Sequence, residues 1–247
     1  MDQQQQFSLL LKMEEVGTMN SFKSFISKEQ LVEKLTEHII EILEKSIKEK
    51  GNASLFVSGG NTPKELFINL SKKDILWEKI TIGLVDERWV ENTNKDSNEY
   101  LVKTTLLQNY ASKAKFIGMY QENKNIYESE LIVSKKYKKL SPFDIVILGM
   151  GNDSHTASLF PNNKKLKEAF NLENKNLCIS IVPDTAPYER MSLTLNAILS
   201  AKNIILHIEG EKKLKVYKDA LKSEDSFETP ISAVLNNKKT NLEVYHT

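Results

Sequence analysis

Short apolar segments separated by helical segments are the feature of this sequence that most restricts its fold. The apolar segments have the length and residue types of buried β-strands, and the stretches between them carry apolar residues at helical spacing. Strands that alternate with helices lie parallel in one sheet, with helices on both faces. The sequence therefore predicts an α/β fold with a mostly parallel sheet. The predicted strands cover residues 53–57, 80–85, 115–119, 143–148, 177–182, 203–208 and 242–246.

The predicted helices lie between these strands and carry start and stop signals. Apolar residues recur at helical spacing over residues 28–49, and Gly51 follows as a stop. Thr62 is placed to cap a helix whose first residue is Pro63, and Ser97 is placed to cap another. The predicted helices cover residues 28–49, 63–70, 97–107, 126–140 and 211–221.

Composition and charge exclude several classes of protein. The formal net charge of +1 lacks the basic excess typical of proteins that bind nucleic acids or anionic membranes. No apolar run approaches the ~20 residues that span a bilayer, and the first residues lack the features of a secretory signal. The single cysteine, Cys178, excludes an internal disulfide and fits a buried strand position. We therefore expect a cytoplasmic protein with no nucleic-acid or membrane partner.

The 247 residues read as one domain. No linker rich in proline, glycine or serine divides residues 1–247, and no internal repeat is evident. We expect the polar first residues, 1–20, to be loosely ordered.

The basic residues are almost all lysines. Only Arg88 and Arg190 are arginines among the 34 basic residues. A chain that uses lysine for ordinary positive charge has reason to keep arginine where a planar guanidinium must bind a phosphate or carboxylate with two hydrogen bonds. Biased codon usage offers the simpler explanation, but both arginines lie beside other informative residues. We therefore interpret them as candidate anion-binding residues.

Two motifs follow predicted strands near the start of the chain. The first, Ser-Gly-Gly-Asn-Thr-Pro, lies between a predicted strand and a predicted helix. Its glycine backbone and the free amides of the helix start could bind a phosphate group, but the motif fits a tight turn with a helix cap equally well. Its candidate binding residues are Ser58, Gly59, Gly60, Asn61 and Thr62. In the second, Asp-Glu-Arg-Trp-Val, Asp86 could act as a base or orient one, and Arg88 could bind an anion. The alternative is that these charged side chains only form ion pairs on the surface.

A third motif, Gly-Met-Gly-Asn-Asp-Ser-His-Thr-Ala-Ser-Leu-Phe-Pro over residues 149–161, supplies an acid–base pair. His155 is the natural general base, because its ordinary pKa lies near neutrality, and Asp153 is placed to orient it. A serine nucleophile is less favoured, since the Gly-x-Ser-x-Gly pattern is absent; the candidates are Ser58, Ser154 and Ser158. No other histidine or cysteine lies at the spacing of metal ligands, so we predict no metal.

Two further cations lie in the last third of the chain. Arg190 begins an alternating apolar run. Lys213 lies in the first turn of the helix predicted after Gly210. There it is either a solvated lysine like most of the others or a ligand of a phosphate group. In an open parallel sheet the carboxyl ends of the strands share one edge, and ligands bind there. We therefore expect residues 58–62, 86–88 and 153–155 to converge on one cleft.

Together the motifs resemble those of the 6-phosphogluconolactonase family, within the wider group that includes glucosamine-6-phosphate isomerases. The resemblance rests on the three motifs above and on Glu-Arg-Met-Ser-Leu-Thr-Leu, and it covers roughly residues 28–240. It implies a Rossmann-like fold and hydrolysis of 6-phospho-D-glucono-1,5-lactone to 6-phospho-D-gluconate in the oxidative pentose phosphate pathway. It implies no cofactor or metal, a sugar-phosphate lactone as the substrate, and a functional link to glucose-6-phosphate dehydrogenase.

The resemblance also implies roles for single residues. His155 would activate a water that attacks C1, Asp153 would orient it, and Arg190 and Lys213 would match phosphate-binding positions, with Arg88 serving either end of the substrate. The family usually has Asp-Gly-His, and this chain has Ser154 at the middle position, which costs roughly 1 kcal/mol if φ is positive there. The alternatives are a deaminase-type aldose–ketose isomerase, disfavoured because Phe160 stands where that branch has a ring-opening glutamate, and a non-catalytic sugar-phosphate sensor.

Overall fold

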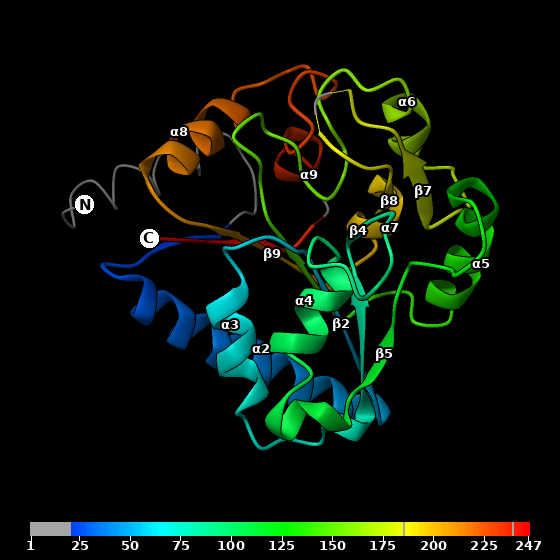
Figure 1. The fold of residues 1–247 in the computed structure, drawn as a ribbon. Coiled ribbons are helices and arrows are strands. Elements are labelled where there is room, and N and C mark those ends of the chain that lie inside the picture. Colours follow the sequence, from blue (N-terminus) through cyan, green and yellow to red (C-terminus); the bar gives the residue numbers. More distant parts are fainter. Residues whose placement is uncertain (1–20, 185, 239) are drawn as a thin grey trace.

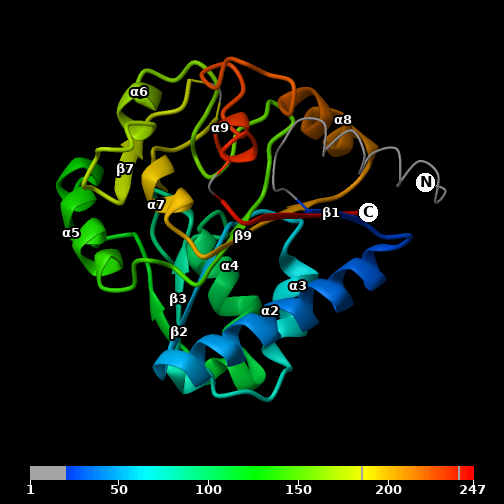
Figure 2. The same ribbon diagram turned by 180° about the vertical axis from the view of Figure 1, so that it is seen from behind.

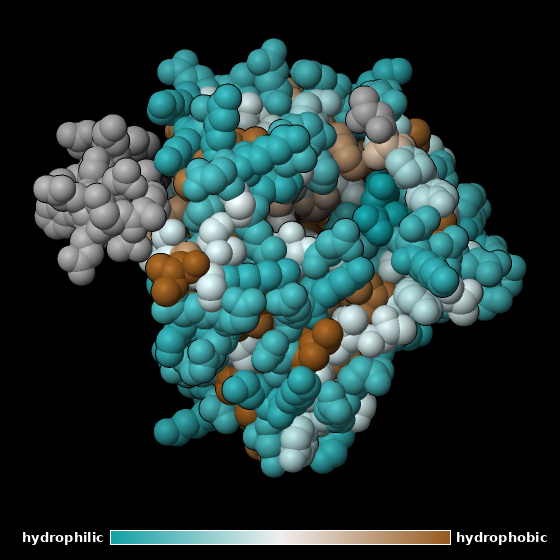
Figure 3. Space-filling view, turned by 60° about the vertical axis from the view of Figure 1, so that its left-hand side comes forward, coloured by the Kyte–Doolittle hydropathy of each residue, from teal (hydrophilic) through white to brown (hydrophobic). Residues whose placement is uncertain are grey.

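The computed structural model describes residues 21–184, 186–238 and 240–247 (Figure 1). The prediction that residues 1–20 are loosely ordered lies outside these residues. Within them, no helix combines the length and the apolar character needed to cross a bilayer. Figure 3 shows a face that is mainly hydrophilic, on which hydrophobic residues appear as small separate patches.

In the described part of the chain the main sheet has seven strands, and every pair of neighbours in it is parallel. Its strand order is β1-β10-β9-β6-β2-β3-β5. This arrangement confirms the predicted α/β fold with a mostly parallel sheet. The strands are β1 Ser21–Ser24, β2 Ala53–Val57, β3 Ile80–Leu84, β5 Lys115–Ile117, β6 Ile145–Leu148, β9 Asn203–Ile208 and β10 Leu242–His246.

Helices lie on both faces of this sheet (Figures 1 and 2). Helices α2, α3 and α4 lie together on one side of β2 and β3, and α5 lies on the other side. The hydroxyl of Ser27 caps the start of α2, and Gly51 ends the helix with a φ of 80°. The helices are α2 Lys28–Lys50, α3 Lys64–Ser71, α4 Asn98–Thr105, α5 Ile126–Lys138, α6 Leu166–Ala169, α7 Leu195–Leu199, α8 Glu211–Ala220 and α9 Ser232–Leu235, with 3₁₀ turns at Trp77–Lys79 and Asn109–Lys113.

A second, smaller sheet is antiparallel. It consists of β4 (Asp86–Arg88), β8 (Arg190–Leu193) and β7 (Cys178–Ile181), in that order. The strand predicted over residues 177–182 therefore exists but lies outside the parallel sheet, because a short loop with no crossover helix returns the chain antiparallel. Cys178 is buried in β7, as expected, and burial raises the pKa of its thiol.

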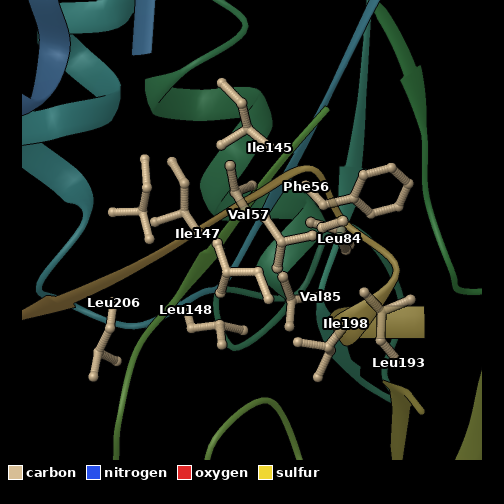
Figure 4. Packing of buried hydrophobic residues seen from close by; sticks show 14 of the residues in the cluster. Phe56, Val57, Leu84, Val85, Ile145, Ile147, Leu148, Leu193, Ile198 and Leu206 are labelled. Atoms are coloured by element: carbon tan, nitrogen blue, oxygen red, sulfur yellow. The ribbon is translucent and has the colours of Figure 1, made fainter. Parts of the chain in front are cut away.

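The central strands rest on a continuous apolar core. Figure 4 shows Val57, Leu84, Leu148 and Leu206 gathered near the ends of β2, β3, β6 and β9, with Ile198 of α7 beside them. Each of these five side chains is fully buried. Close packing of this kind fixes the strand ends, so the loops that leave them start from rigid positions.

Candidate active site

The candidate residues other than Arg190 follow the carboxyl ends of four neighbouring strands, β9, β6, β2 and β3, whereas Arg190 begins β8. The chain runs from β2 through β3 to β5 in one direction across the sheet, and then from β6 through β9 to β10 in the other. The point between β2 and β6 is thus a topological switch point, where open α/β sheets bind ligands. Residues 58–62, 86–88 and 153–155 thus follow neighbouring strands at one sheet edge, as expected, but only some of them line the same cleft.

A cleft of about 240 Å³ opens at this edge. It adjoins a wider hollow of about 550 Å³, and Gly60 lines both. The predicted residues that line the smaller cleft are Ser58, Gly60, Thr62, Asp86, His155 and Lys213, whereas Asn61 and Arg88 line the wider hollow.

His155 and Asp153 form a hydrogen-bonded pair at the cleft. Nδ1 of His155 lies 2.6 Å from Oδ1 of Asp153. Burial alone would raise the pKa of Asp153, but the hydrogen bond and the charge of His155 lower it, so the carboxylate stays ionised. A carboxylate at Nδ1 selects the tautomer that carries its proton there and leaves the lone pair on Nε2. The pair therefore has the arrangement of an oriented general base.

The turn that carries this pair is tight and strained. The Gly151 amide donates to the His155 carbonyl, and the Ser154 amide donates to the Gly151 carbonyl. Ser154 has a φ of 69°, in the left-handed region that favours glycine, so the strain considered from the sequence is present. A Cβ on Gly151 would lie 2.1 Å from Nδ1 of His155 and 2.2 Å from Oδ1 of Asp153. Only glycine at residue 151 leaves room for the pair.

Phe160 separates the imidazole from a buried guanidinium. Its ring centroid lies 4.7 Å from that of His155, and the guanidinium carbon of Arg190 lies 6.0 Å from the Phe160 centroid. The Phe160 ring packs against the imidazole and places an apolar group, with no carboxylate, beside the base.

The two arginines are direct neighbours. Arg88 of β4 pairs with Arg190 of β8, so two like charges lie opposite each other in an antiparallel ladder, which is unfavourable. Arg88 donates to the carbonyl of Asp96 and Arg190 to that of Pro187. The Nε atoms of both arginines are buried, with no hydrogen-bond partner among the described residues. Burial and the charge of Arg88 lower the pKa of Arg190, against the effect of Asp86. A bound anion would offset this repulsion and accept the unused donors.

Lys213 lies in the first turn of α8 and reaches the loop after β6. Its ammonium group donates to the Met150 carbonyl, next to the turn that carries Asp153. Burial lowers the pKa of Lys213, partly against the attraction of Asp153. Lys213 thus brings positive charge to the cleft that His155 lines, which suits the binding of an anion.

The glycine loop after β2 is held by its neighbours. The Ser58 hydroxyl donates to the Ile147 carbonyl, and Gly60 has a φ of 93°, which suits glycine. The prediction that Thr62 caps the next helix is wrong. Pro63 occupies the cap position without a side-chain hydrogen bond, because the chain first makes a turn in which the Lys64 amide donates to the Asn61 carbonyl.

The serine hydroxyls are engaged elsewhere. Besides Ser58, Ser154 donates to the Glu228 carbonyl, and Ser158 donates to Oδ2 of Asp86 over 2.6 Å and is fully buried. None of these bonds is made to the imidazole of His155, so none of the three hydroxyls is held as a serine nucleophile would be. In the described part of the chain, no group of three or more histidine, cysteine or acidic residues is arranged to bind a metal ion.

Two residues outside the predicted set of catalytic and binding residues prove central to the geometry. Glu87, in the middle of β4, is fully buried and accepts four hydrogen bonds. Burial raises the pKa of Glu87 to about 7, against the effect of these bonds. The side chain of Asn98, at the start of α4, donates to Asp86. The signal in the sequence was that Asn98 directly follows Ser97, the predicted helix cap after the Asp-Glu-Arg motif. The predicted cap by Ser97 is confirmed.

Comparison with known proteins identifies close likenesses. The family model of "Glucosamine-6-phosphate isomerases/6-phosphogluconolactonase" matches residues 26–244. A 6-phosphogluconolactonase of Rhizobium meliloti (strain 1021) is 38% identical over 216 residues, which cover 87% of this chain and 93% of that protein. One of Pseudomonas putida is 36% identical over 211 residues, covering 85% and 86% of the two chains.

Solved structures show the same likeness. The crystal structure of a 6-phosphogluconolactonase from Shewanella baltica OS155 matches with a TM-score of 0.89 and 42% identity, covering 92% of this chain and 97% of that one. The structure of 6-phosphogluconolactonase from Thermotoga maritima shares the fold, with a TM-score of 0.75 at 23% identity over 92% of this chain and 100% of that one.

Proposed function

This chain belongs to the family of glucosamine-6-phosphate isomerases and 6-phosphogluconolactonases, and on that basis we propose that it hydrolyses 6-phospho-D-glucono-1,5-lactone to 6-phospho-D-gluconate. The relatives named above are 6-phosphogluconolactonases that match over most of their length. The observation that supports a mechanism is the hydrogen-bonded pair of His155 and Asp153 at a cleft that Lys213 also lines.

Water activation by His155 is the proposed first step. Nε2 of His155 takes a proton from a water molecule as that water attacks C1 of the lactone, and Asp153 holds the imidazole and stabilises the imidazolium that forms. The tetrahedral intermediate then collapses, the bond from C1 to the ring oxygen breaks, and the imidazolium returns its proton to that oxygen. The carboxylic acid that results ionises at neutral pH.

Positive charge serves the two anionic parts of the reaction. The substrate carries a phosphate throughout, and negative charge develops on the C1 oxygen during attack. We assign Arg190 and Lys213 to the phosphate, together with the loop formed by Ser58, Gly59, Gly60, Asn61 and Thr62. Arg88 and Asp86 complete the proposed site: Arg88 supplies positive charge from the adjoining hollow, and Asp86 lies at the cleft wall.

The isomerase branch of the family has less support from this geometry. Phe160 packs on the imidazole where the resemblance would require a glutamate for ring opening, and a phenyl ring cannot relay a proton. The functional link to glucose-6-phosphate dehydrogenase and the cytoplasmic location stay predictions.

A direct assay tests the proposed function. Purified protein is added to freshly generated 6-phosphogluconolactone, and acid release is followed in a pH-stat against the spontaneous rate. We expect release well above the spontaneous rate, and a rate equal to it would refute the proposal. Turnover of glucosamine 6-phosphate in place of the lactone would support the isomerase reading. Binding of 6-phosphogluconate without turnover of either substrate would support a sensor.

A further inference from the structure

Glu87 is a buried carboxylate that the proposed mechanism does not use. It lies between Asp86 and Arg88, both assigned to the site, and its side chain points away from them toward the start of α4. One carboxylate oxygen accepts from the amides of Arg88 and Asn98, each at 2.7 Å. The other accepts from the Glu99 amide at 2.8 Å and the Ser97 hydroxyl at 3.0 Å. Among the described residues, no cation forms an ion pair with Glu87.

These four bonds fix where α4 begins. The first amides of a helix have no partner within the helix, and here the amides of Asn98 and Glu99 are satisfied by a side chain eleven and twelve residues earlier in the chain. Ser97 caps the next free amide, that of Tyr100, and is itself held by Glu87. The carboxylate therefore ties the helix start to strand β4.

The helix start in turn holds the cleft wall. The side-chain amide of Asn98 donates to the Asp86 carbonyl at 2.8 Å and to its carboxylate at 3.3 Å. The other oxygen of that carboxylate accepts from Ser158, in the motif that carries His155. Asn98 also lies against Gly59, since a Cβ on Gly59 would fall 1.8 Å from the Asn98 side-chain oxygen. Asn98 thus contacts the loops after β2 and β3 at once.

We infer that Glu87 is a positioning residue for the proposed lactonase reaction, acting through Asn98 to hold Asp86 and the Gly59 loop at the cleft wall. The inference rests on the proposed function of this site. Displacement of a catalytic or binding group by about 1 Å is enough to lower a reaction rate by an order of magnitude or more. Asn98 can hold both loops only if its own backbone is fixed, and Glu87 provides that restraint.

The test compares two substitutions of buried carboxylates on either side of the same helix start. Glu87→Gln removes the anionic acceptor, and its NH₂ group takes the place of one oxygen, so that it meets the amide of either Asn98 or Glu99 donor to donor. Glu99→Gln is the matched control, because Glu99 is also buried but its side chain bonds Lys103 and Asn92, away from the small cleft. We expect kcat/KM to fall about tenfold or more in Glu87→Gln and to stay within about twofold in Glu99→Gln. Melting temperatures measured alongside report the stability loss of each.

A double-substitution cycle separates positioning from general stability. If Glu87 acts through Asn98, then Glu87→Gln combined with Asn98→Ala loses no more kcat/KM than Asn98→Ala alone. Additive losses would overturn the inference, as would wild-type kcat/KM in Glu87→Gln. Should Glu87→Gln fail to fold, Asn98→Ala decides alone: unchanged kcat/KM in that variant refutes the inference.

An NMR experiment keeps this inference distinct from the proposed function. In Glu87→Gln the backbone amide signals of Gly59, Asp86 and Asn98 should shift together, and in Glu99→Gln those of Gly59 and Asp86 should stay in place. If wild-type protein does not hydrolyse the lactone, the proposed function fails, while this shift pattern still shows that Glu87 positions the cleft wall. Unshifted Gly59 and Asp86 signals in Glu87→Gln would refute the positioning itself.

Discussion

Two histidine–carboxylate pairs in this molecule have almost the same distance between nitrogen and oxygen and very different surroundings. His155 and Asp153 lie 2.6 Å apart on one turn, and His38 of α2 and Glu243 of β10 lie 2.7 Å apart although 205 residues separate them in the chain. Distance alone therefore does not distinguish a general base from an ion pair that stabilises the fold. The other contacts of each pair make the distinction.

The carboxylates of the two pairs are shared differently. Glu243 also binds the ammonium group of Lys23, and the pair joins α2 to β10 and β1. Asp153 receives hydrogen bonds only from His155 in the described residues, and the imidazole lines a cleft beside Lys213. A base needs one free nitrogen that faces bound substrate, whereas a structural pair needs only two partners that must stay together.

The largest effect that would test this comparison comes from removing each histidine in turn. We expect His155→Ala to lose about 10²-fold or more of the lactone hydrolysis rate, because positioned acid–base groups contribute gains of this order. His38→Ala should keep the rate and lose stability instead. Acid release and thermal unfolding, measured on both variants, check this. Full activity in His155→Ala would remove the assignment of His155 as the base.

A smaller effect is expected from crowding the proposed catalytic pair, His155 and Asp153, without removing it. In Gly151→Ala the new Cβ would overlap both Nδ1 of His155 and Oδ1 of Asp153, so one of them must move. We expect kcat to fall about tenfold or more while the protein still folds. Gly149→Ala is the matched control, since a Cβ there has nothing within 4 Å, and its loss of kcat should be clearly smaller. Equal losses of kcat in the two variants would show that any added side chain in this turn lowers activity, whether or not it displaces His155 or Asp153.

The contrast between the pairs also shows what the sequence could predict. Asp153 and His155 were identifiable because they follow glycine at the end of an apolar strand, and local pattern alone places such residues at the sheet edge. The match between His38 and Glu243 was not predictable, because it depends on how α2 and β10 meet across the fold.

Strand β4 was missed for the same reason. Asp-Glu-Arg has none of the apolar character of a strand, and its strand conformation comes from pairing with β8 and from the donors that satisfy Glu87. The edge strand β1 was missed because it depends on pairing with β10 at the opposite end of the chain. Local propensity has little weight where distant partners decide the conformation.

The pair of His38 and Glu243 should be weakened by acid, and this is the third prediction. The hydrogen bond from His38, with Lys23 beside it, lowers the pKa of Glu243 to about 2 against the effect of burial. A carboxylate whose pKa is depressed on folding stabilises the protein above its ordinary pKa of about 4.5, and this contribution is lost as the pH falls toward 2. We expect Glu243→Gln to lower the free energy of unfolding at pH 7 by about 2 kcal/mol.

The pH dependence supplies the check. Denaturant unfolding of wild-type protein should show stability falling between pH 4.5 and 2, and the variant should lack this component of the fall. Lactone hydrolysis at neutral pH should be unchanged in the variant. Parallel pH profiles for the two proteins would mean that Glu243 contributes no linked stability.

The smallest expected effect concerns Ser154, which lies between the two members of the proposed catalytic pair. Its φ of 69° is costly for a residue with a Cβ, and its backbone carbonyl is held by the Ile231 amide. Ser154→Gly keeps that bond and relieves the strain, although glycine loses more entropy on folding. We expect a gain of about 0.5–1 kcal/mol in the free energy of unfolding, with hydrolysis retained. Because the gain requires that the left-handed turn is kept, a variant that is less stable than the wild type would show that the serine hydroxyl, which donates to the Glu228 carbonyl, holds the turn in place.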